Sequence, residues 1–342
     1  MEKEKKSEPV SKSVLKSAKE EETTRINVGP SPHFGHIHST TRLMMTDVLI
    51  ALVPVILVSL YVFQWFAVKQ LMICILTCIG TEAACTRMRN RQSTLYDGSA
   101  VVTALILGLS LPATAPWYVA MIGSVVAIGI GKMVFGGLGM NLFNPAMVGR
   151  AFVMIAFAGV MSASGYELAS TGVDALSQAT PLNIFKQTGA ITPIYDMFWG
   201  VTNGSIGETS AFACLLGGFY LVWRGVAAWE IPLGVIIAVI FWGTIGTIIN
   251  PESQWTVLHH LFSGSLLFGA FFIATDPVTS PLSAKGRFQF GIGVGIILML
   301  LRSFSGYPEG MMFAVLLMNA LSPLINRWTI PKPFGVKTSR IL

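Results

Sequence analysis

The chain has 342 residues, of which 53% are hydrophobic and only 12% are charged. Soluble domains average about a quarter charged residues, so this composition excludes a soluble enzyme and indicates an α-helical membrane protein. The formal net charge of +6 does not indicate nucleic-acid binding, because the basic residues lie in short segments between apolar runs rather than in one patch.

The first part of the chain is polar. Residues 1–25 are largely Lys, Glu and Ser, and they offer almost no apolar surface to bury, so we expect them to be disordered. A secretory signal would need its apolar region close to the start, whereas about forty polar residues precede the first apolar run. Residues 1–40 are therefore predicted to form a cytoplasmic tail.

Ten apolar segments follow this tail, and each suits a whole or broken membrane helix. They cover residues 47–65, 69–86, 98–111, 116–135, 145–161, 209–223, 229–249, 257–275, 287–301 and 307–325. The third and sixth segments are short for full spans. Pro112 follows the third segment and Pro277 follows the eighth, so we expect broken helices at these two places.

The basic residues of the short loops predict the orientation, because Lys and Arg concentrate on the cytoplasmic side. With the N-terminus inside, the inner loops contain Arg87, Arg89, Arg91, Lys132, Arg224, Lys285, Arg287 and Arg327. The outer side holds few basic residues. Both termini, including a tail at 328–342, are thus predicted in the cytoplasm, and the long segment 162–208 is predicted outside.

Two short motifs recur in the two halves of the chain with the same internal spacing. They are PATAP at 112–116 with PVTSP at 277–281, and Met-Asn followed by Pro at 140–145 and again at 318–323. Either chance similarity or an internal repeat explains them. A repeat of five helices would relate residues 41–161 to residues 209–327 in opposite orientations, an architecture that places ligands near the membrane midplane.

The outer segment contains the sequence DALSQATPLN at 174–183. One interpretation is structural, since Thr180 followed by Pro181 is typical of a residue that caps a short helix. A functional interpretation comes from longer motifs elsewhere in the chain. These are DGSAVVT at 97–103, GGLGMNLFNPA at 136–146, ATDPV at 274–278 and FSGYPEGMMFAVLLMN at 304–319.

Through these motifs the chain resembles the NqrB/RnfD family, which contains the RnfD component of Rnf electron-transport complexes and, more distantly, the NqrB component of the sodium-pumping NADH:quinone reductase. The resemblance covers nearly all of residues 40–340. In that family a flavin transferase attaches FMN through a phosphoester to the Thr of an Asp-x-x-Ser-x-Ala-Thr pattern. The resemblance therefore implies that Thr180 carries FMN, with Asp174, Ser177 and Ala179 in the attachment motif; Gln178 stands where the family often has Gly.

The resemblance also implies a non-covalent riboflavin within the helices, and partner subunits with iron–sulfur clusters and a second threonyl-FMN. The glycine-rich stretch 129–139 would let the backbone approach a ring, with Asn141, Asn144 and Arg150 nearby as hydrogen-bond donors. Tight helix packing explains the glycines equally well. The four cysteines lie in apolar segments without metal-site spacing, so we expect no metal site in this chain and assign no catalytic residue.

Ionisable residues in or near the spans are candidates for an ion path, because a charge is costly in hydrocarbon. They are Asp47, Glu82, Asp97, Glu230, Asp276 and Glu309. We take Glu82, Asp97, Asp276 and Glu309 as the ion-path candidates, with Glu82 the most interior. The structural alternative is pairing, for which Arg42, Arg87 and Arg302 are the available partners.

The sequence thus predicts an all-α membrane flavoprotein subunit of a bacterial inner-membrane Rnf-type complex, with its flavin on the outer side. It would relay electrons between partner subunits, while the complex couples ferredoxin and NAD chemistry to cation movement. A flavin transferase would mature it. Two alternatives remain: an NqrB-like component of the sodium-translocating NADH:quinone reductase, and a flavin-free secondary transporter, which the inverted repeat would suit.

Overall fold

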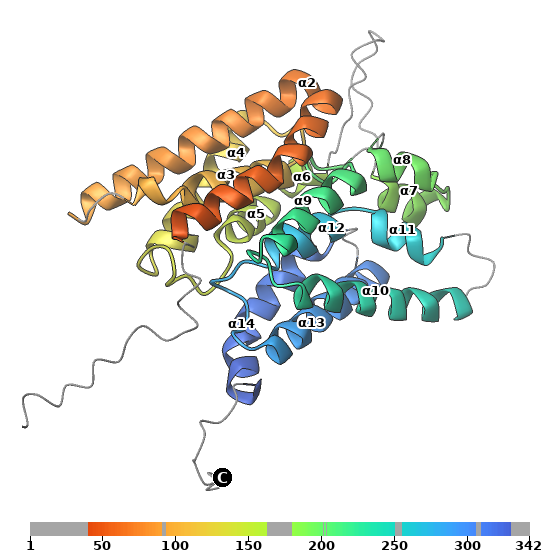
Figure 1. Ribbon diagram of the computed structural model, residues 1–342. Helices are drawn as coiled ribbons and strands as arrows, with labels where there is room; N and C mark the ends of the chain where they lie inside the picture. The colour runs from red at the N-terminus through yellow and green to blue at the C-terminus, as the bar shows by residue number, and fades with distance from the viewer. Residues whose placement is uncertain are drawn as a thin grey trace, which may run out of the picture. The chain divides into compact units, whose positions relative to one another are not determined.

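A computed structural model describes residues 40–90, 94–162, 180–200, 202, 204–249, 255–305 and 309–329. Within these ranges the regular structure is helical (Figure 1). The first part comprises α2 (Thr41–Met88), η2 (Leu95–Asp97), α3 (Ser99–Ser110), α4 (Trp117–Ile128), η3 (Gly129–Met133), α5 (Pro145–Ala156) and α6 (Ala158–Ser162). The second part comprises α7 (Pro181–Thr188), α8 (Ile194–Trp199), α9 (Ala211–Trp223), α10 (Glu230–Ile249), α11 (Val257–Phe262), α12 (Leu266–Phe268), η4 (Gly269–Ile273), α13 (Ala284–Phe304) and α14 (Met311–Thr329).

Each of the ten apolar segments contains helix. The first two are joined in α2, which breaks at Gln64, where φ is 48° and ψ is −124° (Figure 1). The eighth is divided into α11, α12 and the π-helical segment η4; the interruption lies at residues 263–265, and η4 ends at Ile273, before Pro277. The third ends in α3 at Ser110, two residues before Pro112.

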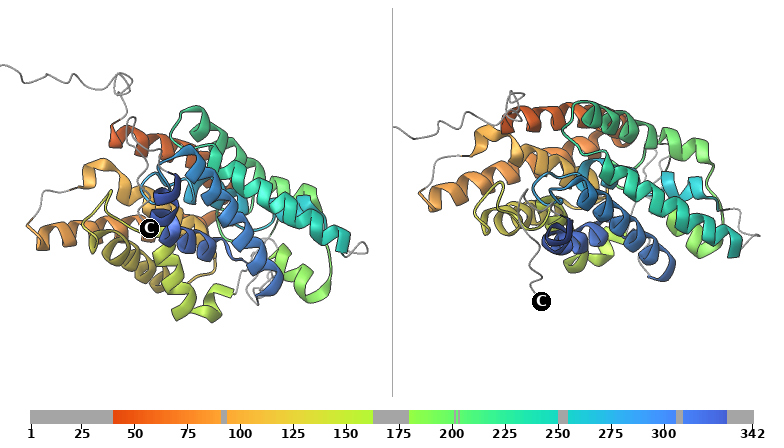
Figure 2. Two further views of the ribbon diagram at one scale, coloured as in Figure 1. Left: turned by 90° about the horizontal axis from the view of Figure 1, so that it is seen from below. Right: turned by 60° about the horizontal axis from the view of Figure 1, so that its bottom comes forward.

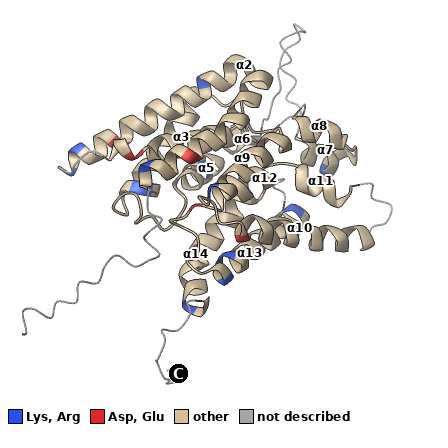
Figure 3. Ribbon diagram, viewed as in Figure 1, with Lys and Arg blue, Asp and Glu red and all other residues tan. Residues whose placement is uncertain are grey.

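Among the described residues, three helices are long and apolar enough to cross a membrane, namely α2, α10 and α13. The shorter apolar helices cover Ser99–Ser110, Trp117–Met133, Pro145–Ala156 and Ala211–Trp223. Many large side chains on these helices point outward, among them Leu57, Ile155 and Phe241, while charged residues are sparse along the ribbon (Figure 3). An apolar exterior of this kind suits hydrocarbon rather than water. The count of ten spans and the cytoplasmic location of the termini stay predictions.

The two recurring motifs differ in their structural settings. The residues at 112–116 follow α3 and those at 277–281 follow η4, so this pair lies after a short or broken helix in each half. The second pair is not equivalent, because Pro145 is the first residue of α5 whereas Pro323 lies inside α14. Only the first pair therefore supports the predicted inverted repeat.

Glycines allow close approach where helices cross. α10 packs against α13, which in turn packs against α14 (Figure 2). A Cβ atom on Gly295 would lie 2.8 Å from the carbonyl oxygen of Val235, and one on Gly291 would overlap the carbonyl oxygen of Ile231. The Gly291-x-x-x-Gly295 spacing thus serves helix packing, as its sequence pattern indicates.

We expect Gly291→Ala to destabilise the protein by about 1–3 kcal/mol, because the added methyl group meets backbone at the α10–α13 crossing. Thermal unfolding in detergent, followed by size-exclusion chromatography, measures the change. Gly80→Ala is the matched control, since a Cβ there meets nothing within 4 Å. Equal melting temperatures for the two variants would contradict the close crossing.

Candidate functional site

Thr180 lies immediately before α7 and caps it. Its hydroxyl oxygen accepts a hydrogen bond from the backbone N–H of Asn183 at 3.3 Å, and Pro181 occupies the first helical position. The structural interpretation of this motif is therefore confirmed. This role as a cap is compatible with the predicted attachment of FMN, because the capping oxygen is still a hydroxyl group that can form an ester, and it lies at the positive end of the helix dipole. The other motif residues, Asp174, Ser177 and Ala179, lie outside the described residues.

The side chain of Thr180 borders a small polar pocket, which we call the Thr180 pocket. It is formed by the start of α7, the segment before α9, the turn between α11 and α12, and the segment before α14. Its polar lining includes Thr180, Thr202, Glu208, Ser263 and Glu309, and the backbone of Gly264 also borders it. Thr180 is only 8% exposed, so its hydroxyl belongs to this interior rather than to the surface.

Two of these residues, Glu208 and Glu309, are held by one guanidinium group. Arg150 on α5 donates from Nη1 to Glu208 Oε1 at 3.0 Å and from Nη2 to Glu309 Oε2 at 3.0 Å. The Glu208 side chain is 1% exposed. Burial and the neighbouring Glu309 carboxylate raise the pKa of Glu208 to about 8, although Arg150 acts in the opposite direction.

Glu208 is the functional candidate that the sequence reasoning missed. It lies one residue before the predicted sixth span, and a search for charges inside spans passed over it. A signal was available, since a carboxylate at the very edge of an apolar run is also poorly hydrated. Glu309, which the sequence analysis predicted as an ion-path candidate, belongs to the same cluster around Arg150. It is thereby separated from the other three candidates, which are Glu82, Asp97 and Asp276.

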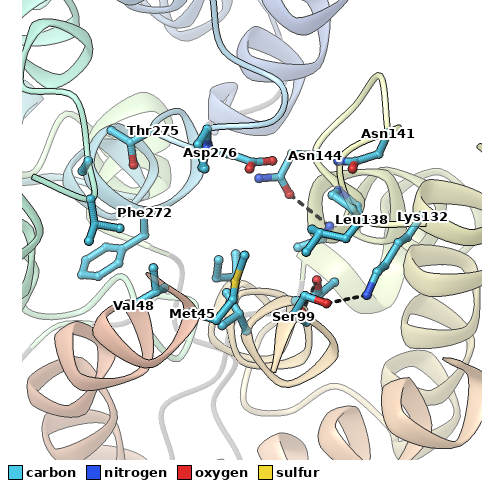
Figure 4. A pocket seen from close by; sticks show the side chains of 18 of the residues that line it. Met45, Val48, Ser99, Lys132, Leu138, Asn141, Asn144, Phe272, Thr275 and Asp276 are labelled. Carbon is cyan, nitrogen blue, oxygen red and sulfur yellow. Dashed lines mark hydrogen bonds between the residues drawn. The ribbon is translucent and has the colours of Figure 1, made fainter. Parts of the chain in front are cut away.

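A second pocket, which we call the Lys132 pocket, lies where η3, η4 and the start of α5 approach α2 and α3 (Figure 4). Its lining includes Met45, Ser99, Lys132, Asn141 and Asp276. Both π-helical segments end here, and such segments occur frequently at functional sites. Most of the remaining lining is apolar, so this pocket has the character of a small-molecule site.

Lys132 is 1% exposed, and its positive charge is paired with a carboxylate inside the protein. Its Nζ lies 2.7 Å from Glu82 Oε2 and donates to Ser99 Oγ at 2.6 Å. Thr94 donates to the other Glu82 oxygen, and Asp97 accepts from the Ser99 backbone N–H at 2.8 Å. Glu82 is therefore paired, but with Lys132 instead of the arginines considered as partners, because η3 packs against α2.

The two predicted asparagines border the Lys132 pocket, and their amides are used differently. Asn144 Oδ1 caps α5 by accepting from Ala146 and Met147, and its Nδ2 donates to the carbonyl of Ile273 at 3.3 Å. Asn141 Nδ2 donates to Phe143, while its buried Oδ1 has no partner among the described residues. Asn141 is thus the amide available to a ligand.

The remaining predicted residues lie apart from one another. Arg150 does not line the Lys132 pocket with the asparagines, since it binds the two glutamates. Asp276 lines that pocket and accepts from Val278 and Thr279, each at 3.2 Å. Two other acidic residues form separate ion pairs. They are Asp47 with Arg224 at 3.2 Å and Glu230 with Arg287 at 3.4 Å.

Comparison with known proteins gives consistent results. The model of the NQR2, RnfD, RnfE family matches residues 27–335. The chain is 40% identical over 316 residues to the D subunit of the Na(+)-translocating ferredoxin:NAD(+) oxidoreductase complex of Acetobacterium woodii, covering 91% of this chain and 96% of that protein. It is 38% identical over 325 residues to the D subunit of the proton-translocating ferredoxin:NAD(+) oxidoreductase complex of Clostridium ljungdahlii, covering 91% and 96%. It is also 38% identical over 349 residues to the D subunit of the ion-translocating oxidoreductase complex of Erwinia tasmaniensis, covering 90% and 98%.

We expect Lys132→Met to lower the stability by about 3–5 kcal/mol, because it leaves the buried Glu82 carboxylate without its cation. Thermal unfolding in detergent measures the loss. The double variant Lys132→Met with Glu82→Gln should recover part of it, which a double-mutant cycle quantifies. Lys285→Met, at an exposed position near the start of α13, is the control. Strictly additive effects of the two single changes would contradict the pair.

Proposed function

Because the chain belongs to the NQR2, RnfD, RnfE family, we propose that it is the membrane-embedded D subunit of an ion-translocating oxidoreductase complex. Its part is to relay electrons between neighbouring subunits through an FMN attached to Thr180. The observation that carries the proposal is the match over residues 27–335, together with relatives that cover nine tenths of the chain and are named as the D subunits of such complexes. These names favour an Rnf-type complex over a quinone reductase or a secondary transporter.

The start of α7 favours a phosphoester on Thr180, whereas the carboxylates of Glu208 and Glu309 in the same pocket oppose it. The Thr180 oxygen lies at the N-terminus of α7, where the helix dipole favours a negative charge. The attached flavin supplies the electron carriage, so the residues of this chain need only hold it and tune its surroundings. Thr180 acts as the anchor, and the covalent link keeps the flavin at a high effective concentration beside the protein.

The relatives from Acetobacterium woodii and Clostridium ljungdahlii are named as subunits of ferredoxin:NAD(+) oxidoreductase complexes. We therefore propose ferredoxin and NAD as the donor and acceptor of the complex that contains this chain. Electrons would reach it from, and leave it to, subunits with iron–sulfur clusters and flavin. A flavin transferase would attach the FMN to the outer segment, and the complex would lie in the bacterial inner membrane.

The Lys132 pocket is our candidate site for the non-covalent riboflavin. Its apolar walls suit the flat ring, and the unpartnered Oδ1 of Asn141 is placed to accept a hydrogen bond from an imide N–H (Figure 4). Asn144 would act indirectly, since it fixes the start of α5 against η4. The acidic residues around this pocket, Glu82, Asp97 and Asp276, are the proposed ion path.

We expect Thr180→Val to abolish flavin attachment, because valine keeps the shape of threonine but lacks the oxygen that forms the ester. In-gel fluorescence of the denatured protein, expressed with a flavin transferase, measures attachment. Thr188→Val, at the other end of α7, is the matched control and should remain fluorescent. A fluorescent Thr180→Val band, or a dark wild-type band, would reject the proposed anchor.

We expect Glu82→Gln to slow ion-coupled turnover by about tenfold or more while FMN stays attached, because it removes the most deeply buried carboxylate of the proposed path. Turnover and ion uptake in inverted membrane vesicles, each normalised to the in-gel flavin signal, measure this effect. Asp196→Asn on α8, outside the predicted spans, serves as the control. Normal ion uptake by Glu82→Gln would leave Glu82 with the structural role of pairing Lys132.

A further inference from the structure

Glu208 and Glu309 lie together beside Thr180. We propose that Glu208 and Glu309, hereafter the glutamate pair, form a buried proton-binding site that holds one exchangeable proton between the two carboxyl groups. The ligand is thus a proton, and the site is the Thr180 pocket. The existence of this proton does not depend on the flavin, whereas its linkage to the flavin, described below, rests on the proposed function.

The first argument is geometric. Arg150 bonds one oxygen of each carboxylate, with 3.0 Å to Glu208 Oε1 and 3.0 Å to Glu309 Oε2, so its guanidinium group holds the two carboxylates next to each other. The three residues come from α5, from the segment before α9 and from the segment before α14. Two carboxylates that share one guanidinium group in a poorly solvated site repel each other, and one proton between them removes the repulsion.

The second argument concerns the Glu208 oxygen that does not bond Arg150. Glu208 Oε2 is fully buried, and no described residue donates a hydrogen bond to it. A buried carboxylate oxygen without a hydrogen-bond donor destabilises the protein, because it loses its hydrogen bonds to water on folding and gains none in the protein. The neighbouring Glu309 is itself a carboxylate and has no hydrogen to donate, so a bound proton is what completes the hydrogen bond between the two groups.

The third argument is the balance of charge around the pair. Arg302 of α13 is the second cation nearby, but its guanidinium donates to the carbonyls of His260 at 2.7 Å and Ser263 at 2.8 Å. It therefore offers charge without a direct bond to the pair. Cys214 of α9 is the other titratable group facing Glu208, and it is buried and adds no positive charge.

The affinity for this proton suits exchange near neutral pH. Burial and the neighbouring Glu309 raise the pKa of Glu208 to about 8, which favours a proton on this carboxyl group at neutral pH. An ordinary exposed glutamate would be fully ionised at the same pH.

Attachment of FMN would change this affinity. The phosphoester adds a negative charge at Thr180, which lines the same pocket as both glutamates. A negative charge in a poorly solvated pocket favours the protonated form of its neighbours, so the flavinylated protein should bind the proton more tightly. The glutamate pair would in this way couple the charge of the flavin site to proton binding.

Infrared spectroscopy of the full chain in lipid nanodiscs, with 13C-labelled glutamate, tests the proposal. The Thr180→Val variant is measured first, so that no FMN can be attached. We expect a protonated-carboxyl band at neutral pH that shifts with the label and disappears as the pH rises through about 8. Because the label marks only glutamate, Asp276 does not contribute. The band should be lost in Glu208→Gln and in Glu309→Gln and retained in Glu230→Gln, whose residue pairs with Arg287 elsewhere.

The outcomes separate the two claims. Absence of a labelled band at neutral pH in the protein with both glutamates would overturn the proton site, even if neither Gln variant folds. Persistence of the band in both variants would also overturn it. In the flavinylated protein with Thr180 intact, the pH at which the band disappears should be higher, and an unchanged pH would overturn the linkage. A dark band in the fluorescence gel would instead reject the attached FMN and leave the proton site standing.

Discussion

Every charge buried in this apolar helical protein needs a partner, and the structure depends on how those partners are supplied. Removing one member of a buried pair leaves an uncompensated charge, which is far more destabilising than replacing both members. Lys132 and Glu82 join η3 to α2, while Arg150 joins α5 to the segments before α9 and α14. These pairs hold together parts of the chain that are distant in sequence, at places where helices are short or broken.

The helices were predictable from the sequence because a long apolar run is a local property. All ten predicted segments contain helix, and the eighth ends before Pro277 as expected, whereas its interruption at residues 263–265 was not predicted. The kink at Gln64 lies within a few residues of the predicted connection between the first two segments, at residues 66–68. The similarity between residues 140–145 and 318–323 does not correspond to equivalent structure, because Pro145 begins α5 whereas Pro323 lies inside α14.

The partners of the site residues were much less predictable. Glu82 was predicted to be the most interior candidate, but its partner Lys132 lies fifty residues away, on a π-helical segment that no local sequence pattern predicts. Asn141 and Asn144 both line the Lys132 pocket, but Arg150, on the helix that Asn144 caps, binds the two glutamates instead. Six residues along an α-helix span about 9 Å, which is enough to move a side chain from one pocket to the next.

That spacing gives α5 a particular position in the molecule. Asn144 at its start is bonded to the end of η4 beside the Lys132 pocket, and Arg150 further along holds the glutamate pair beside Thr180. A shift of α5 would therefore act on both pockets together, because interiors as closely packed as this one move as units. Gly149 shows how little room there is, since a Cβ atom there would overlap the backbone of Gly123 on α4. A rigid α5 thus fixes the glutamate pair and the Lys132 pocket relative to each other, whichever charges the two pockets carry.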